Sequence, residues 1–283
     1  MAHLRILEES DASLLDTFLR SHRDTSMFLR SNARRSGLAY RPGRFHALYA
    51  GAFQDGQLVG VAAHCWNGML LVQAPESLEE LAPSVIGWSG RRVTGLSGPL
   101  DQVRRARIAL ALADAPATMD TDEALYGLDL TDVVVPRPLR DGAVVCRAPL
   151  PEERDTLCAW RLAYFIETLG AMDSVESRER AAEVLDAQIA DANVWVAVHQ
   201  GRLVSLSAFN AALPDIVQLG GIYTPPEFRG RGYAKAAVAA SLLAARARGA
   251  TRAVLFTSNP SAARSYEAVG FHHLGHYGLI LLS

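Results

Sequence analysis

The sequence predicts an α/β (α+β) protein built from two similar domains, each with helices followed by a β-hairpin. Residues 47–65 and 195–210 both read as strand, turn and strand, with the turns at Gly56 and Gly201. A glycine between two β-rich runs is a hairpin signal. The two turns are offset by 145 positions, which is about one domain length. Because strand–turn–strand patterns are common, chance similarity is the alternative to an internal duplication.

Helical patterns precede both hairpins, because apolar residues recur there at helical spacing. Gly170 predicts a C-cap at the end of one helix, and Asp173 with Glu176 resembles a capping box at the start of the next. The helical patterns cover residues 11–19 and 25–35 in the first half, and residues 151–170 and 174–192 in the second half.

A proline-containing segment separates the two halves. Residues 136–143 contain two prolines and a glycine, which is typical of a linker. The predicted domains are therefore 1–135 and 144–283. This division agrees with a chain of 283 residues, a length that suggests one large or two modest domains.

The composition is that of a soluble globular protein, with 49% hydrophobic and 20% charged residues. The formal net charge of −2 does not predict a nucleic-acid or membrane-surface partner. No secretory leader and no apolar run of roughly 20 residues is apparent, so we expect a cytoplasmic protein. Its oligomeric state stays open. We also expect no metal site, since neither the cysteines (Cys65, Cys146, Cys158) nor the histidines (His272, His273, His276) show suitable partners.

Arginines and glycines alternate where a strand meets a helix. Arg229–Gly230–Arg231–Gly232 lies between an apolar strand-like run and the alanine-rich helical pattern of residues 233–248. The first turn of a helix has free backbone N–H groups, and glycines let a phosphate approach them closely. Arginine forks add donors that suit phosphate oxygens. The pattern predicts a pyrophosphate cradle, and the alternative is a plain turn with solvated arginines.

Two other nucleotide motifs do not fit this loop. A P-loop requires Ser or Thr after its lysine, whereas Ala236 follows Lys235. The dinucleotide-binding fingerprint requires a third glycine at the position that Lys235 occupies.

The order of motifs in the second half resembles the GNAT superfamily of acyl-CoA N-acyltransferases. Residues 229–234 match its (Gln/Arg)-x-x-Gly-x-(Gly/Ala) motif, and residues 255–271, LFTSNPSAARSYEAVGF, match its late strand–helix segment. The resemblance covers residues 145–283 and implies a mixed, mostly antiparallel sheet flanked by helices, with acetyl-CoA as co-substrate. It implies that the glycine loop binds the pyrophosphate and that the preceding strand binds the pantetheine arm. The implied cofactor-binding residues are Ile222, Tyr223, Thr224, Arg229, Gly230, Arg231, Gly232, Tyr233, Ala234 and Asn259.

The resemblance also implies a catalytic acid. Tyr266 stands seven residues after Asn259, where many relatives place the tyrosine that protonates the departing coenzyme A. Proton donation from a tyrosine of pKa near 10 to a thiol near 8.5 is uphill by about 2 kcal/mol. A tyrosine that packs between helix and sheet is the alternative. Asn259 before Pro260 also reads as a helix N-cap, which explains it without a ligand.

The position of the usual glutamate base is occupied here by Gln218. Glutamine cannot accept a proton, although it can orient a water. Glu167 is a candidate substitute because it shares a helix face with Trp160 and Tyr164, and relatives line the acceptor pocket with this helix. The alternative is an amphipathic helix with Glu167 in solvent. His199 and Asp215 are further candidate bases.

The first half lacks the cradle. After its hairpin the chain reads Gln73–Leu78 without glycine or arginine, and Glu79 and Glu80 would repel a pyrophosphate. We expect a GNAT-like copy that has lost cofactor binding and shapes the acceptor cleft, with an unrelated α/β domain as the alternative. A later basic segment could meet anionic ligands or face solvent; its arginines are Arg104, Arg105 and Arg107.

Together these features predict a tandem N-acetyltransferase. Its second domain would transfer an acetyl (acyl) group from acetyl-CoA directly to a primary amine of a small molecule or peptide. Because Gln218 occupies the base position, a catalytically inactive acyl-CoA-binding sensor or interaction module is the alternative. The sequence does not identify the acceptor amine.

Overall fold

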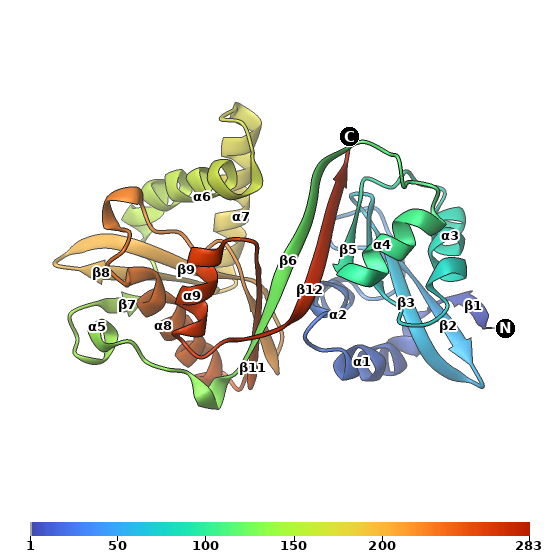
Figure 1. The fold of residues 1–283 in the computed structure, drawn as a ribbon, viewed down its shortest axis with the longest axis horizontal. Coiled ribbons are helices and arrows are strands. Elements are labelled where there is room, and N and C mark those ends of the chain that lie inside the picture. Colours follow the sequence, from blue (N-terminus) through green and yellow to red (C-terminus); the bar gives the residue numbers. More distant parts are fainter. Residues whose placement is uncertain (1) are drawn as a thin grey trace. The chain divides into compact units, whose positions relative to one another are not determined.

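The computed structural model describes residues 2–283, and the chain divides into two compact units (Figure 1). Unit 1 comprises Met1–Leu125 and Leu274–Ser283. Unit 2 comprises Tyr126–His273. Each unit contains both parallel and antiparallel strand pairs together with helices of its own.

The boundaries of the units differ from those predicted. Both boundaries fall within strands, namely β6 (Ala117–Asp129) and β12 (His272–Leu282). The proposed linker at 136–143 therefore lies inside unit 2 and contains the short helix α5 (Arg137–Arg140). The last strand joins unit 1 because β12 pairs with β5 (Gly95–Pro99). No local sequence pattern signals a pairing between residues so far apart in the chain.

Unit 1 is a sheet in the order β1-β2-β3-β4-β5-β12-β6, with helices α1 to α4. β4 and β5 are parallel, and the β1–β2, β2–β3, β3–β4 and β5–β12 pairs are antiparallel. The two predicted helices and the predicted hairpin of the first half are confirmed. The elements not yet given are β1 (His3–Ile6), α1 (Ala12–Ser21), α2 (Met27–Ser36), β2 (Ala47–Gln54), β3 (Gln57–Cys65), β4 (Met69–Gln73), α3 (Leu78–Ser89) and α4 (Leu100–Ala109).

Unit 2 is a sheet in the order β6-β11-β10-β9-β8-β7, with helices α5 to α9. β10 and β11 are parallel, and the β7–β8, β8–β9 and β9–β10 pairs are antiparallel. The two units thus repeat the same arrangement of a hairpin, a third strand and a parallel neighbour. The remaining elements are β7 (Val145–Arg147), α6 (Arg154–Leu169), α7 (Val175–Ala190), β8 (Val194–His199), β9 (Arg202–Ala212), β10 (Ile216–Leu219), α8 (Tyr233–Ala247), β11 (Arg252–Thr257) and α9 (Pro260–Glu267).

The two hairpins share an irregularity. The register between β2 and β3 shifts between Ala52 and Phe53, and the register between β8 and β9 shifts between Ala197 and Val198. A β-bulge adds one residue to one strand and is a defined local feature rather than a general property of hairpins. The two shifts are 145 positions apart, the same offset as the turns. This repeated bulge supports duplication over chance similarity.

A second feature recurs at the start of each unit. Arg5 on β1 holds Asp11 through both guanidinium Nη atoms, at 2.6 and 2.7 Å. Arg147 on β7 holds Glu153 in the same way, at 2.8 and 2.6 Å. Each carboxylate also accepts the backbone N–H three residues earlier, from Glu8 and from Leu150 respectively. The spacing of six residues and the bonding pattern are the same, so the duplication extends to the first strand and turn of each unit.

Helices cover both faces of the unit 2 sheet (Figure 1). Neighbouring residues of a strand point to opposite faces, and Val196 packs with the helices α6 and α7 whereas Ala197 packs with α8. Alanines at 236 and 237 let α8 lie close to the strands. The start of α8 and the end of α6 therefore approach the same stretch of chain from the two faces of the sheet.

The predicted helix ends are mostly confirmed. α6 ends at Gly170, which has a left-handed φ of 67°. The predicted capping box at Asp173 is wrong, because the N-cap of α7 is Ser174, whose side chain accepts the N–H of Ser177 at 3.1 Å. Asp173 instead pairs with Arg178 at 2.6 Å.

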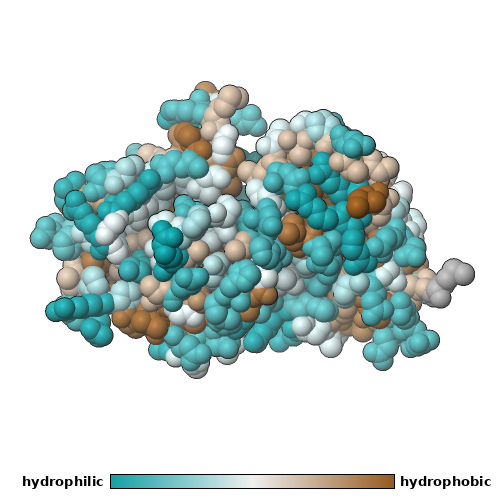
Figure 2. Space-filling view, viewed as in Figure 1, coloured by the Kyte–Doolittle hydropathy of each residue, from teal (hydrophilic) through white to brown (hydrophobic). Residues whose placement is uncertain are grey.

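The visible surface is mostly hydrophilic, and its hydrophobic residues form small scattered groups (Figure 2). Within residues 2–283, every helix is too short or too polar to cross a membrane.

Candidate functional site

The strand before the glycine loop leaves one of its neighbours. Among the described residues, the register between β10 and β11 ends at Gln218 and Val254. The chain nevertheless stays bonded to β9, because Tyr223 and Leu206 exchange both backbone hydrogen bonds at 3.0 and 2.8 Å. Backbone groups alternate in direction along an extended chain. The N–H and C=O of Ile222 and the N–H of Thr224 therefore point away from β9, to the side that β11 has left.

The glycine loop leads from this strand into α8 with an accessible backbone. Gly230 and Gly232 have φ values of 75° and 82°, which favour glycine. In the described part of the chain, a Cβ on Gly230 would meet no atom within 4 Å, and one on Gly232 would meet only Lys235 Cε at 3.6 Å. Gly232 is the N-cap of α8 and brings no side chain to the N–H groups of its first turn. The loop can therefore accept an anion against its backbone.

The arginines and Tyr233 of this loop differ in their surroundings. Arg231 is exposed. Tyr233 is buried and packs against the rings of His199 and Phe228, so only its backbone is available to a ligand. Arg229 is engaged within the protein, because its Nε donates to Thr224 O at 2.9 Å and its Nη2 donates to Glu167 at 2.6 Å. Phosphate binding by the loop stays a prediction for all these residues.

Glu167 joins the end of α6 to the strand and the loop. Its Oε1 accepts the hydroxyl of Tyr223 at 3.0 Å, and its Oε2 accepts Arg229 Nη2. Burial, together with the bond to Glu167, raises the pKa of Tyr223. If Glu167 took a proton, its ion pair with Arg229 would be lost. The geometry therefore favours a structural role for Glu167, and its role as a base stays a prediction.

The predicted helix face of α6 does converge on the strand. Trp160 packs against Tyr223 with ring centroids 6.3 Å apart, and Glu167 bonds the hydroxyl of the same tyrosine. Tyr164, on the same face, contributes electrostatically to raising the pKa of Tyr266 on α9. Burial is the larger cause and takes the pKa of Tyr266 well above its ordinary value. Tyr266 therefore holds its proton at neutral pH, as a catalytic acid must before transfer.

Asn259 caps α9 as predicted. Its Oδ1 accepts the N–H groups of Ser261 and Ala262 at 2.9 and 3.3 Å. Both acceptor positions of this oxygen are thus used inside the protein. A contact between Asn259 and coenzyme A stays a prediction.

Gln218 is buried within the sheet. It stands between Ala211 and Val254 in the sheet and is 2% exposed. Its Oε1 is buried and accepts no hydrogen bond from the residues that the structure describes. The other candidate bases are no better placed, since His199 bonds to Ala143 O at 2.8 Å and Asp215 precedes β10, at the end away from the glycine loop.

Arg161 is the residue of this region that the sequence analysis missed. It lies on α6, is 1% exposed, and its Nη2 donates to Gln188 Oε1 at 2.7 Å. A Cβ on Gly221, whose φ is 67°, would lie 1.4 Å from Arg161 Nη1. A Cβ on Gly220 would likewise lie 1.9 Å from Asn210 Nδ2. The paired glycines after a buried strand were the available signal, because such glycines often mark a close approach of another group.

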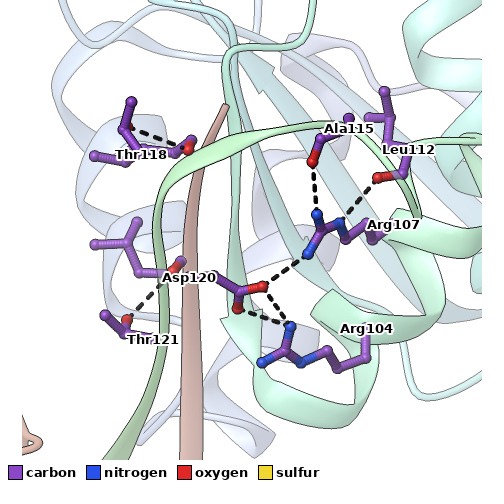
Figure 3. Close-up of polar contacts among 9 residues, drawn as sticks. Arg104, Arg107, Leu112, Ala115, Thr118, Asp120 and Thr121 are labelled. Atoms are coloured by element: carbon purple, nitrogen blue, oxygen red, sulfur yellow. Dashed lines mark hydrogen bonds and ion pairs between the residues drawn. The ribbon is translucent and has the colours of Figure 1, made fainter. Parts of the chain in front are cut away.

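The basic segment of unit 1 is neutralised by the protein's own carboxylates. Arg104 and Arg107 on α4 both bind Asp120 on β6, each at 2.7 Å (Figure 3). Arg105 pairs with Glu79 at 2.7 Å. An anionic ligand would therefore compete with carboxylates that are already in place.

One expectation about the histidines is wrong. His276 does have a carboxylate partner, since its Nδ1 bonds to Asp122 on β6. That aspartate lies 154 positions earlier, so spacing in the sequence could not reveal it. Across residues 2–283, no group of three or more His, Cys, Asp or Glu side chains is arranged to hold a metal ion.

Comparisons with known proteins agree with this geometry. Residues 155–271 match the model of the acetyltransferase (GNAT) family. Comparison with curated protein sequences found no match. The matches to solved structures below confirm the predicted mixed-sheet fold with two GNAT-like domains, and at their low identities they establish the fold alone.

Three of these structures illustrate the fold match. A Drosophila protein has a TM-score of 0.65 at 13% identity, over 100% of this chain and 99% of that one. A GCN5-related N-acetyltransferase from Kribbella flavida has a TM-score of 0.58 at 15% identity, over 91% and 93% of the two chains. A tandem GNAT protein from the clavulanic acid biosynthesis pathway has a TM-score of 0.51 at 14% identity, over 99% and 98%.

Proposed function

We propose that unit 2 transfers an acetyl group from acetyl-CoA to a primary amine, because residues 155–271 match the model of the acetyltransferase (GNAT) family. The acceptor would be a small molecule or a peptide, and no covalent enzyme intermediate would form. The observation that carries the proposal is the open backbone at Gly230 and Gly232 at the start of α8. Folded chains normally satisfy their own polar backbone groups, so an accessible helix start beside outward-pointing strand groups suits a phosphate-bearing ligand.

Different residues of the site would bind different parts of acetyl-CoA. The backbone from Gly230 to Ala234 would hold the diphosphate, and Arg231 would add positive charge. Ile222 and Thr224 would pair with the amide groups of the pantetheine arm. Bound acetyl-CoA supplies an activated acyl group: an amine–carbon bond forms as the carbon–sulfur bond breaks, while the amine loses one proton and the sulfur gains one.

Two proton transfers set the demands on the protein. An amine of pKa about 10.4 must lose its proton at pH 7, which costs roughly 4.6 kcal/mol. The sulfur must gain a proton, and Tyr266 is the proposed donor because it stays protonated at neutral pH. Its raised pKa makes donation to a thiolate more uphill than for an ordinary tyrosine. The proposal therefore needs a group that favours the neutral amine.

Calorimetry with coenzyme A tests the cradle. Gly232→Glu places bulk and negative charge where the diphosphate would lie, and we expect at least a 100-fold loss of affinity. Gly201→Glu is the matched control, because Gly201 has a similar φ of 74° and open space around it but lies in the β8–β9 turn. Equal affinity for coenzyme A in the wild type and in Gly232→Glu would refute the assignment of the glycine loop as the diphosphate site.

The alternative function is an acyl-CoA-binding sensor without turnover. It is favoured by Gln218 at the expected base position and by the engagement of Glu167 with Arg229. Release of free thiol from acetyl-CoA with a panel of amines separates the two functions. Tight binding without release for any amine supports the sensor. If the enzyme turns over, Tyr266→Phe should lower its rate, and an unchanged rate would remove the acid assignment.

A further inference from the structure

Arg161 is a buried cation whose partners carry no compensating charge. Its Nη2 bonds the amide oxygen of Gln188, and its guanidinium carbon lies 5.7 Å from the centre of the Tyr164 ring. Its Nε is buried and has no acceptor among the described residues. A buried charge is costly unless it is paired. Arg161 lies on α6, and its guanidinium packs against Gly221 in the segment that leads to the glycine loop.

The surroundings of Arg161 contain few other titratable groups. Cys158 and Tyr164 on α6 are its titratable neighbours. α7 and β9 present the uncharged amides Gln188 and Asn210. The two ion pairs of α6 are each internally neutral; they are Arg154–Asp186 and Glu167–Arg229. Burial lowers the pKa of Arg161 only to about 10, so it is charged at neutral pH.

The position of Arg161 relates it to the reacting end of the proposed ligand. If the diphosphate lies at the glycine loop and the arm runs back along Thr224 and Ile222, the arm reaches Gly221 and Gly220 next. An extended chain advances roughly 3.3 Å per residue, so the thioester end lies near these glycines. Arg161 Nη1 is packed against Gly221. Tyr164, its aromatic neighbour, also interacts electrostatically with the proposed acid Tyr266.

We propose that Arg161 keeps the acceptor amine unprotonated through its buried positive charge, and so replaces the missing carboxylate base. This inference rests on the proposed function. A like charge disfavours the ammonium form, and at about 6 Å with an effective dielectric constant near 20 the amine pKa falls by roughly 2 units. The ammonium proton passes to solvent before attack, and the nitrogen lone pair forms the bond to the acyl carbon as the carbon–sulfur bond breaks. Tyr266 donates its proton to the departing sulfur, and the second proton that the nitrogen loses on becoming an amide returns to Tyr266.

The dependence of kcat/KM on pH tests the proposal, with thiol release from acetyl-CoA as the readout. In the wild type the rate should rise with pH around a midpoint well below the pKa of the free amine. Arg161→Gln should move that midpoint up by about 1–2 units and lower the rate at pH 7 by roughly 10- to 100-fold. The rate should recover toward the wild-type value above pH 9.5. Arg161→Lys retains the charge and should stay within about half a unit of the wild type.

Gln188→Glu gives the same test without removing the arginine. The new carboxylate would stand where Gln188 Oε1 accepts Arg161 Nη2, so it would neutralise the charge in place. The pH midpoint should again rise, even if Arg161→Gln does not fold. Arg154→Gln is the matched control, because it removes a positive charge from the exposed start of α6 and should leave the profile unchanged.

The outcomes separate this inference from the proposed function. Wild-type turnover with coincident pH midpoints in the wild type, Arg161→Gln and Gln188→Glu would overturn the role of Arg161 alone. A uniform loss of rate at every pH would also overturn it, because that result indicates a purely structural arginine. Absence of thiol release by the wild type with every amine would remove both proposals.

A weakly basic amine provides a second readout. An acceptor with a pKa below 6 is already neutral at pH 7, so the defect of Arg161→Gln should shrink to about 3-fold or less with it. A defect that is equally large for weakly and strongly basic amines would contradict an effect on amine protonation. Coenzyme A binding, measured by calorimetry, should be unchanged in Arg161→Gln and in Gln188→Glu.

Discussion

Units 1 and 2 share a bulged hairpin but end their third strand differently. In unit 2 the strand leads to Gly230 and Gly232, where the backbone is open. In unit 1 the N–H of Ala74, just after β4, donates to Gln102 Oε1 at 2.6 Å. The residue at the start of the following helix is also engaged, since Arg105 pairs with Glu79. Both partners come from α4, so side chains of unit 1 engage the segment that follows β4.

This difference shows how a duplicated fold can lose a ligand without losing stability. A backbone donor that is satisfied inside the fold contributes to stability at all times. A donor that waits for a ligand contributes only when the ligand binds. The bond from the N–H of Ala74 to Gln102 therefore supports the hypothesis that unit 1 no longer binds the cofactor.

The units also differ in their buried arginines. Arg30 on α2 of unit 1 is 4% exposed and has a carboxylate, Asp16, at 3.6 Å. Arg161 of unit 2 has amide and aromatic neighbours instead. The other buried arginine of unit 2, Arg252, is 6% exposed and also has a carboxylate, Asp129, at 3.2 Å. Arg161 thus departs from the ordinary pairing of buried charges, as its proposed role requires.

The largest effect is expected from adding a methyl group beside Arg161. In Gly221→Ala the new Cβ would lie 1.4 Å from Arg161 Nη1, and φ is 67°. The guanidinium would have to leave its place, and we expect the free energy of unfolding to fall by roughly 3 kcal/mol or more. Gly201→Ala has a similar φ in open space and should cost about 1–2 kcal/mol. Equal losses in urea denaturation would show that Arg161 adapts freely and that its position is not fixed.

Gln102→Leu probes the closed end of unit 1 and should have the next largest effect. It leaves the buried N–H of Ala74 without its acceptor, which should lower the free energy of unfolding by roughly 1–3 kcal/mol. Gln54→Leu, at an exposed glutamine of the same unit, should change it by less than about 0.5 kcal/mol. Coenzyme A binding should be the same in both variants. A loss of binding in Gln102→Leu would contradict the assignment of the ligand site to unit 2 alone.

The sequence predicted the features that depend on local patterns. Both hairpins are present where expected, and so are the four helical segments predicted before them. The C-cap at Gly170 and the N-cap at Asn259 are also present. The glycine loop is accessible at the predicted strand–helix junction because φ values above zero and a free helix start are properties of a few neighbouring residues. These are the features that a short stretch of chain decides for itself.

The features that sequence reasoning missed depend on residues far apart in the chain. β12 joins unit 1 through a pairing with β5 that spans most of the sequence. Arg229 was expected at a phosphate but lies against Glu167, 62 positions earlier. Arg161 and Gly221 are likewise meaningful only as a pair. Spacing within an element cannot reveal which distant side chain a position will meet.

Acidification should compare the two duplicated ion pairs. Arg5 holds the pKa of Asp11 down at about 2, against an ordinary value of 3.8, chiefly through its hydrogen bond. The folded state therefore keeps this charge to lower pH, and its stabilisation is present above about pH 4 and is lost as the pH falls toward 2. Because Arg5 is 37% exposed, we expect at most about 1 kcal/mol between pH 6 and pH 3.

Chemical denaturation at the two pH values measures this contribution. Asp11→Asn should lose less stability on acidification than the wild type does. Arg147 lowers the pKa of Glu153 in the same way, so Glu153→Gln should behave similarly. Unequal responses would show that the duplicated geometry has not preserved the energetics.

The smallest effect is expected at the basic helix of unit 1. Asp120 neutralises Arg104 and Arg107 there (Figure 3), but all three side chains are partly exposed, and Arg107 also bonds to the carbonyl groups of Leu112 and Ala115. Asp120→Ala should therefore cost only about 0.5–1 kcal/mol, and less in high salt. If Arg104 and Arg107 form an anion site that Asp120 occupies in the wild type, added sulfate should stabilise the Asp120→Ala variant but not the wild type. An equal response of both proteins to sulfate would mean that these arginines form no such site, and that unit 1 has no anion-binding surface left at this helix.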